Sequence, residues 1–217
     1  MTSPGDGVAI RRQVRILLLL DATRRAGLEP LPVLRLHVMA YLSDVLSPVW
    51  DITPFDGRVL KRDGGPFYPE LQRDLDRLVG RGLVKVAKIG HVPLGRGRVR
   101  IEGHYSINPV LAQPVLALLP TWPEEARLGD FMGELLLSAA SLSDEEIDEA
   151  FREDATYSNG RIGKGNVIEF ADWTGSNYSA TAAEKLGTLV PTSASVGAGE
   201  KLHLYVRHLR TRLNGGR

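Results

Sequence analysis

The sequence predicts a mainly helical α+β fold with a small β-hairpin. Two observations lead to this prediction. Apolar residues recur at intervals of three and four in several segments, which is typical of helices that bury one face. Between residues 83 and 107 apolar and polar residues instead alternate on either side of a Gly-containing turn, which is typical of two paired strands.

Three helices are expected before the hairpin, over residues 8–26, 31–46 and 69–80. Each is followed or closed by a residue that stops helices, namely Gly27, Pro48 and Gly80. The hairpin strands are expected over 83–89 and 98–107. Because helix, helix, helix, strand, basic turn, strand is the order of a winged helix, we expect a winged-helix-like domain over residues 8–120.

The connection between the second and third helices, residues 49–66, is dense in Gly, Pro and Asp. A loop of this length is uncommon in a compact domain and is usually functional or disordered. Its apolar residues argue against disorder, so we expect it to pack on a surface of this chain or of a partner. The candidates for partner binding are Trp50, Phe55 and Leu60. The alternative is that Trp50 and Phe55 seal the core.

The remaining chain divides by composition into three parts. Residues 121–189 are expected to form an acidic helical region with a Gly/Asn-rich loop and a short strand over 167–170. Within it, Ser143 to Glu146 is a capping box that begins an acidic helix. Residues 190–200 have the composition of a flexible linker. Residues 201–217 form a basic C-terminal helix and tail, in which Tyr205 and Leu209 are further partner-binding candidates.

Charge is distributed unevenly along the chain, although the net charge is only +1. Residues 81–100 carry six Lys or Arg and no acid, and residues 201–217 carry five. Between them, residues 124–154 carry eleven Asp or Glu against two Arg. Such blocks suggest separate surfaces for separate partners, and the alternative is that they are solvated faces without a partner.

The sequence contains no recognisable catalytic apparatus. Cysteine is absent, which excludes disulfides, Cys-ligated zinc and thiol catalysis. The segment 160–165 lacks the spacing and the Lys-Ser/Thr pair of a phosphate-binding P-loop. The five histidines match no zinc or nucleophile motif, and the consecutive acids of 144–149 fan out around a helix. We predict a protein that is not an enzyme and uses no cofactor or metal; the alternative is an enzyme with dispersed ligands.

DNA is the first partner to test for a winged helix. The third helix normally enters the major groove, but here it carries Glu70, Asp74 and Asp76 against Arg73 and Arg77, which predicts a poor base-reading helix. The hairpin is better suited to the DNA backbone. Its candidate nucleic-acid-binding residues are Lys85, Lys88, Arg96, Arg98 and Arg100. The alternative is that these cations pair with the acidic segment of this chain or with a partner protein.

Three runs in the first half, VRILLLLDA, LRLHVMAYLSDVLSP and TPFDGRVLKRDGGPFYPELQRDLDRLVGRGLVKV, lie within residues 14–86. Together they resemble the middle component of bacterial three-component ABC-ATPase defence systems, the group that includes the Lamassu type. The histidine-containing stretch of that family after the second helix is replaced here by SDVLSPVW. The resemblance implies a small non-catalytic subunit beside an SMC/Rad50-like ATPase and an effector, often a nuclease, in antiviral or anti-plasmid defence.

We therefore expect an accessory subunit that bridges an ATPase, an effector and the DNA backbone without sequence preference. The alternative is a winged-helix transcription regulator that binds an operator as a dimer. No secretory signal is expected, and the longest apolar run, Ile16–Leu20, is far below the ~20 residues that span a bilayer. These features predict a cytoplasmic protein without a membrane partner.

Overall fold

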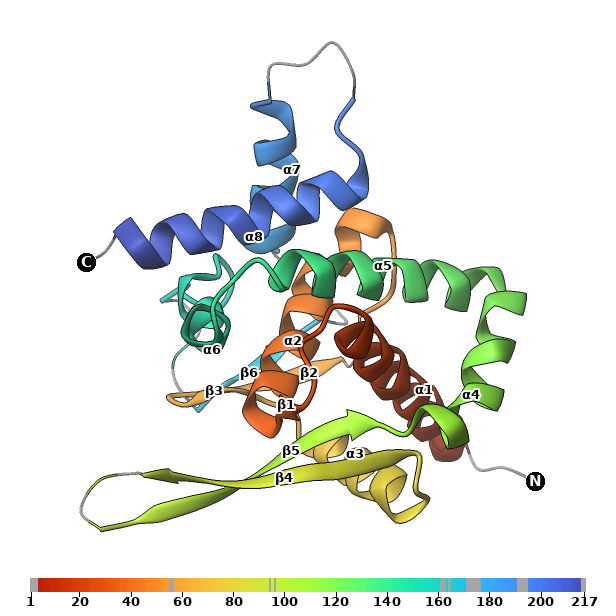
Figure 1. Cartoon of the computed structure of the whole chain (residues 1–217). Coiled ribbons are helices and arrows are strands. Elements are labelled where there is room, and N and C mark those ends of the chain that lie inside the picture. The colour runs from red at the N-terminus through yellow and green to blue at the C-terminus, as the bar shows by residue number, and fades with distance from the viewer. Residues whose placement is uncertain are drawn as a thin grey trace.

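The computed structural model describes residues 4–54, 57–93, 95, 97–160, 163, 165–170, 177–190 and 195–215 (Figure 1). Its helices are α1 (Pro4–Arg25), α2 (Val33–Leu46), α3 (Pro69–Gly80), α4 (Pro109–Leu118), α5 (Pro123–Ala139), α6 (Asp144–Glu153), α7 (Tyr178–Thr188) and α8 (Ala198–Gly215), with 3-10 turns η1 (Ser47–Trp50) and η2 (Leu119–Thr121). Its strands are β1 (Leu31–Pro32), β2 (Arg58–Arg62), β3 (Gly65–Phe67), β4 (Val84–Pro93), β5 (Val99–Ile107) and β6 (Val167–Glu169). The fold is mainly helical with two small antiparallel sheets, so the expected α+β class is confirmed.

The first sheet joins the beginning of α2 to the hairpin, in the strand order β1-β5-β4. The expected helix over 31–46 is wrong at its first two residues, which form β1. Leu31 pairs with Tyr105 and is fully buried, so it lies in the sheet, and the helix begins after Pro32. The helix over 69–80 and the pairing of the two hairpin strands are confirmed. The expected end of the first strand at residue 89 is wrong, because residues 90–93 also pair with β5 and extend β4 to Pro93.

The second sheet, in the order β3-β2-β6, lies in the segment expected to be a long connection. That expectation is wrong for residues 58–67, where β2 and β3 form a hairpin around Asp63-Gly64. Asp-Gly is a common turn between paired strands, and this signal was present in the sequence. The strand expected near 167–170 is confirmed, and it pairs with β2 across more than 100 residues of chain.

The two halves of the chain share one core. Leu19 of α1, Leu135 of α5 and Leu202 of α8 are all fully buried in the same cluster. In Figure 1, α5 lies across α1 and α2, and α8 lies across α5 and α6. The expected capping box at the start of α6 is confirmed, because Ser143 and Glu146 each accept the other's backbone N–H. Of the expected linker, residues 191–194 lie outside the described residues, and Ala198 already belongs to α8.

Candidate nucleic-acid interface

The hairpin β4–β5 projects from the body of the molecule, at the lower left of Figure 1. Residues that pair directly across an antiparallel ladder point to the same face. Lys85 pairs with Ser106, Lys88 with His104, and Val92 with Arg100, and these positions on β5 are separated by even numbers of residues. Lys85, Lys88 and Arg100 therefore share one face of the hairpin.

A β-bulge makes this shared face possible. Lys85 and Lys88 are three residues apart, and in a regular strand they would point to opposite faces. The register shifts between Val86 and Lys88, so that Ala87 is an extra residue on β4. Sequence alternation alone could not show this, because the bulge depends on the pairing with β5.

The cations of the hairpin are exposed and, for the most part, have no acidic partner. Lys85, Lys88 and Arg98 are exposed and make no ion pair within the described part of the chain. Arg100 is half-buried and lies 3.9 Å from the buried carboxylate of Glu102. Arg96 lies outside the described residues. The opposite face of the hairpin carries Ile89, Val99 and Ile101, each more than half exposed.

The acidic segment of the chain is occupied by other cations. On α8, Arg210 lies 3.2 Å from Glu146 and Arg212 lies 3.0 Å from Glu153. From α2, the Arg35 guanidinium bonds both Asp144 and Asp148, at 2.7 and 2.8 Å. No described cation of the hairpin contacts this acidic segment. The expected alternative, that the hairpin cations pair with residues 124–154, is therefore not found among the described residues.

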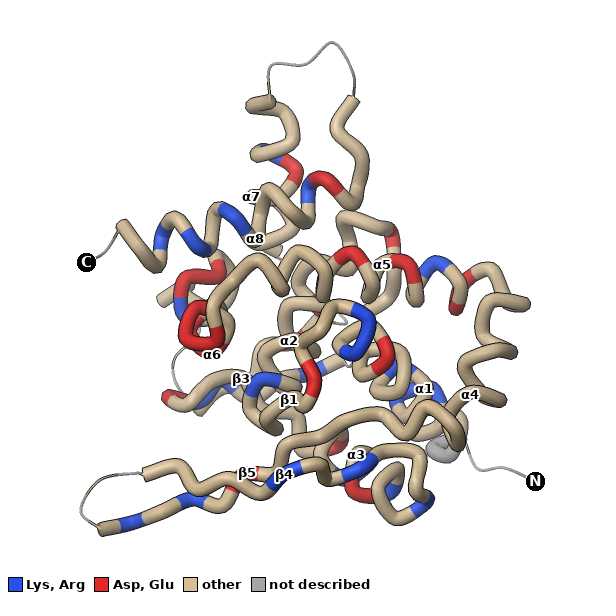
Figure 2. The backbone as a smooth tube through the Cα atoms, in the orientation of Figure 1, with Lys and Arg blue, Asp and Glu red and all other residues tan. Residues whose placement is uncertain are grey.

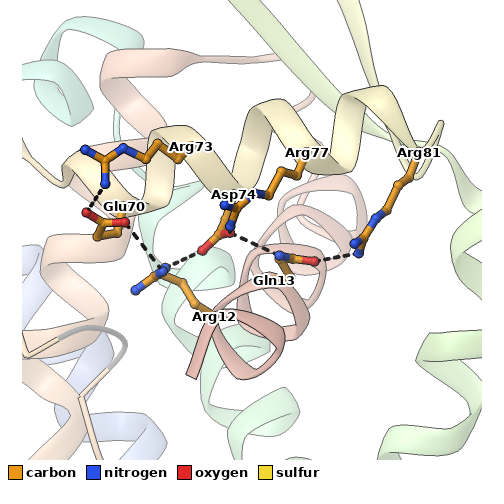
Figure 3. A network of polar contacts seen from close by, with 7 residues as sticks. All are labelled: Arg12, Gln13, Glu70, Arg73, Asp74, Arg77 and Arg81. Atoms are coloured by element: carbon orange, nitrogen blue, oxygen red, sulfur yellow. Dashed lines mark hydrogen bonds and ion pairs between the residues drawn. The ribbon is translucent and has the colours of Figure 1, made fainter. Parts of the chain in front are cut away.

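The third helix has fewer free acids than its sequence suggests (Figure 3). Asp74 is fully buried and accepts bonds from Arg12 and Gln13 of α1, at 2.5 and 3.0 Å, and from Arg77 at 2.8 Å. Glu70 pairs with Arg73. The interpretation that three acids of α3 face a groove is wrong for Asp74, because α1 covers its carboxylate. The partners lie 61 and 62 residues away, so the helix alone could not show it.

Three arginines follow one another along α3 and its end at intervals of four, and Figure 3 shows them in a row on the helix. Arg73 and Arg77 keep 66% and 57% of their side chains exposed, and Arg81 is exposed and donates to Gln13 at 2.8 Å. Asp76 is the remaining exposed acid, and it accepts a bond from Gln72. The exposed surface of α3 therefore presents a row of arginine side chains, two of which are paired with acids of the same helix.

The structure describes four of the five partner-binding candidates, and it does not bring these four together on one exposed surface. Tyr205 and Leu209 are each 1% exposed, and both face the interior beneath α8. Trp50 is partly buried and packs on Phe131, with ring centroids 5.9 Å apart. Leu60 is partly buried in β2, opposite Phe67 and Val167. Phe55 lies outside the described residues. For Trp50 the structure shows the core-sealing contact.

A buried polar cluster that the sequence gave no reason to expect holds α8 in place. Asp154 is fully buried and accepts bonds from the hydroxyls of Tyr41, Ser179 and Tyr205, at 2.5, 2.7 and 2.7 Å. Burial, with the nearby carboxylate, raises the pKa of Tyr41 and of Tyr205, so both remain neutral donors. None of these groups reaches solvent, so the cluster fastens α2, α7 and α8 together and offers no access to a substrate.

The wider molecule gives no chemical assignment. Among the described residues, no group of three or more His, Cys, Asp or Glu is arranged to hold a metal ion. In the same part of the chain, no helix is long and apolar enough to cross a membrane. Comparisons with protein-family models, with curated proteins and with solved structures give no match to this chain.

Proposed function

We propose that this protein is a non-catalytic accessory subunit that contacts the DNA backbone through a winged-helix module. The order α1-β1-α2-α3-β4-β5, with a sheet in the order β1-β5-β4, supports a winged helix whose wing is the hairpin β4–β5. The second sheet is then an insertion between α2 and α3 that β6 ties to the C-terminal half.

One observation carries the proposal: in the described part of the chain Lys85, Lys88 and Arg98 of the hairpin make no ion pair, whereas Lys201, Arg210 and Arg212 of α8 are each paired with a glutamate. Lys85 and Lys88 share a face with Arg100 on a projecting element, and Arg98 precedes β5. Cations placed this way neutralise phosphates and release counterions without reading bases. The arginines of α3 lie on the adjacent element, but Arg73 and Arg77 are paired with Glu70 and Asp74, so the proposal rests on the hairpin.

The accessory role rests on the sequence resemblance over residues 14–86. We propose that the chain sits beside an SMC/Rad50-like ATPase and an effector in antiviral defence, and helps to hold them on DNA in the cytoplasm. The absence of cysteine agrees with a reducing compartment. Co-purification with a co-expressed ATPase encoded by an adjacent gene tests this role. A chain that stays apart from that ATPase would contradict it.

The DNA part of the proposal is tested by binding to a random-sequence duplex at low salt. In the hairpin variant, Lys85, Lys88 and Arg98 are changed together to Ala. In the matched α8 variant, Lys201, Arg210 and Arg212 are changed instead, and these three are paired with Glu184, Glu146 and Glu153. We expect the hairpin variant to bind roughly 10- to 100-fold more weakly and the α8 variant to bind like wild type. Equal affinity of all three proteins would overturn the proposal.

A transcription regulator is the second candidate, and the arginine row of α3 is the observation that favours it. A base-reading helix needs exposed donors on its outer surface, and Arg73, Arg77 and Arg81 are such donors. This function requires a preferred site, bound at least about 1000-fold more tightly than random DNA. Footprinting on the DNA around its own gene decides between the two, because a backbone-binding subunit protects no preferred site.

A further inference from the structure

An apolar groove lies between the beginning of α1 and the pair α4–α5, at the right of Figure 1. It has a volume of about 800 Å³. The first wall is the α1 segment from Gly7 to Val14, and the second is formed by Val115, Leu118, Leu119 and Trp122. Ile10, Leu118 and Trp122 are each more than half exposed, at 54%, 56% and 53%.

The helix α4 is unusual for an outer helix because it contains no charged residue. Its sequence is PVLAQPVLAL, and Ala112 is the residue of α4 that is buried. Within α4, Leu111, Val115 and Leu118 follow one another at intervals of four and three, which places them in one stripe. Trp122 follows η2 and lines the same groove as Val115 and Leu118. An exposed apolar stripe of this kind beside a groove is typical of a surface that another chain covers.

The rim of the groove carries charged side chains without an ion pair in the described part of the chain. Arg11 lies on the α1 side and Glu124 and Glu125 lie on the α5 side. None of the three has a hydrogen-bond or ion-pair partner in the described part of the chain. The Oε2 atom of Glu125 is also buried without a hydrogen-bond donor. An occupant with a cation opposite the glutamates and an acid opposite Arg11 would match the charges of the rim.

We propose that the occupant is a second copy of this chain, related by a two-fold axis through the groove. In an isologous interface, each surface meets its own counterpart. Arg11 of one copy then faces Glu124 and Glu125 of the other, twice over, and Val8 and Ile10 of each α1 cover the other copy's apolar stripe. Val8 is 62% exposed in the single chain.

The proposal goes beyond DNA binding and does not rest on it. The end of β4 far from the body and α4 lie at opposite sides of the molecule in Figure 1, so dimerisation leaves both hairpins free. A failure of DNA binding in the hairpin variant would leave the mass of the protein unchanged. A failure to dimerise would leave the effect of the hairpin variant unchanged.

The experiment measures the mass of the full chain by sedimentation equilibrium over a range of concentrations. We expect twice the 23.8 kDa of one chain. Changing Leu118 and Trp122 together to Glu should raise the dissociation constant of the dimer by on the order of 100-fold or more, because unpaired carboxylates would be buried. The matched control changes Leu137 and Leu189 to Glu. These residues are 56% and 74% exposed away from the groove, and the control should remain dimeric.

Charge reversal keeps the test decisive if the apolar variant fails to fold. Arg11→Glu alone, or Glu124→Arg with Glu125→Arg, should weaken the dimer by about tenfold, and combining all three should restore it. Restoration requires that these side chains meet across the interface. A wild-type mass of 23.8 kDa at every concentration would overturn the proposal, as would equal dissociation of the Leu137/Leu189 control. A combined variant that stays dissociated would also overturn it.

Discussion

The hairpin β4–β5 and the helix α8 carry similar positive charge in the sequence, but their surroundings differ. Figure 2 shows α8 beside the acidic α6, whereas the hairpin extends away from the acidic helices. Arg210 and Arg212 on α8 bond glutamates of α6, while Lys85 and Lys88 on the hairpin contact no acid in the described residues. Similar charge in the sequence therefore meets two different surroundings: α8 is paired with acids of its own chain, and Lys85 and Lys88 are not.

The largest expected effect concerns the buried carboxylate that fastens α8. Changing Asp154 to Ala leaves the hydroxyls of Tyr41, Ser179 and Tyr205 without their common acceptor. We expect a loss of about 3–5 kcal/mol in the free energy of unfolding, measured by urea denaturation. Glu153→Ala, which removes an exposed pair with Arg212, is the control and should cost less than about 1 kcal/mol. Similar losses for both would contradict a core role for Asp154.

Substitutions of apolar residues should also affect stability differently in α8 and in the hairpin. Leu209 of α8 is 1% exposed and Ile101 of the hairpin is 70% exposed. Leu209→Ala should destabilise the protein by about 2–4 kcal/mol because it leaves a cavity. Ile101→Ala should cost less than about 1 kcal/mol. If thermal unfolding shows a larger loss for Ile101, the hairpin is packed against something that the isolated chain does not explain.

Lowering the pH should destabilise the core without weakening DNA binding by the folded protein. Burial lowers the pKa of His37 to about 4, and the charge of Arg62 acts in the same direction. The Nδ1 atom of His37 accepts the backbone N–H of Tyr68 at 3.2 Å and so cannot easily take a proton. The ordinary histidine pKa of the unfolded chain lies above the folded value. The unfolded chain therefore binds the proton first as the pH falls from about 6.5 to 4.

We therefore expect the contribution of His37 to be fully present above about pH 6.5. At pH 4 the free energy of unfolding should be lower by up to about 3 kcal/mol. Urea denaturation across this range checks it, and His37→Gln should flatten the dependence. DNA binding by the folded protein should not weaken over the same range, because the proposed contacts use lysine and arginine and not histidine. Weaker binding before any loss of stability would contradict this expectation.

The smallest expected effect concerns the surface pairs of α8. Changing Arg210 and Arg212 together to Ala removes two exposed ion pairs, whose arginine side chains are each 52% exposed. Such pairs contribute about 0–1 kcal/mol each because solvent screens them. We expect a shift of no more than a few degrees in the thermal midpoint by calorimetry. A loss as large as that of Leu209→Ala would mean that charge, and not burial, holds α8 in place.

Local patterns in the sequence predicted most of the elements. Helical spacing identified α3, alternation identified β4 and β5, and the Ser143–Glu146 pair identified the start of α6. Each of these signals comes from residues that are close together in the chain. The Asp-Gly turn between β2 and β3 is also a local signal. The surrounding Gly and Pro residues instead favoured the prediction of an irregular loop.

What the sequence could not show depends on contacts between distant residues. The sequence of α3 predicted an exposed acid at Asp74, but Arg12, 62 residues earlier in the chain, bonds its carboxylate and helps to bury it. Tyr205 and Leu209 were expected to face a partner, but an amphipathic helix does not reveal whether its apolar side meets another chain or its own. Here that side meets the chain's own core, which includes Ala183 and Leu202. The ion-pair partners of residues 124–154 also could not be predicted, because Arg35, Arg210 and Arg212 are distant from them in the chain.

The salt dependence of DNA binding tests the difference between the two basic regions most directly. The logarithm of the association constant for random duplex DNA should fall linearly with the logarithm of the salt concentration, with a slope of about −0.9 for each phosphate contact. Changing Lys85, Lys88 and Arg98 to Ala should make this slope shallower by roughly 2 to 3. Changing the paired Lys201, Arg210 and Arg212 should leave the slope within about 0.5 of wild type. Equal changes of slope in the two variants would contradict the assignment of the hairpin as the DNA-contacting surface.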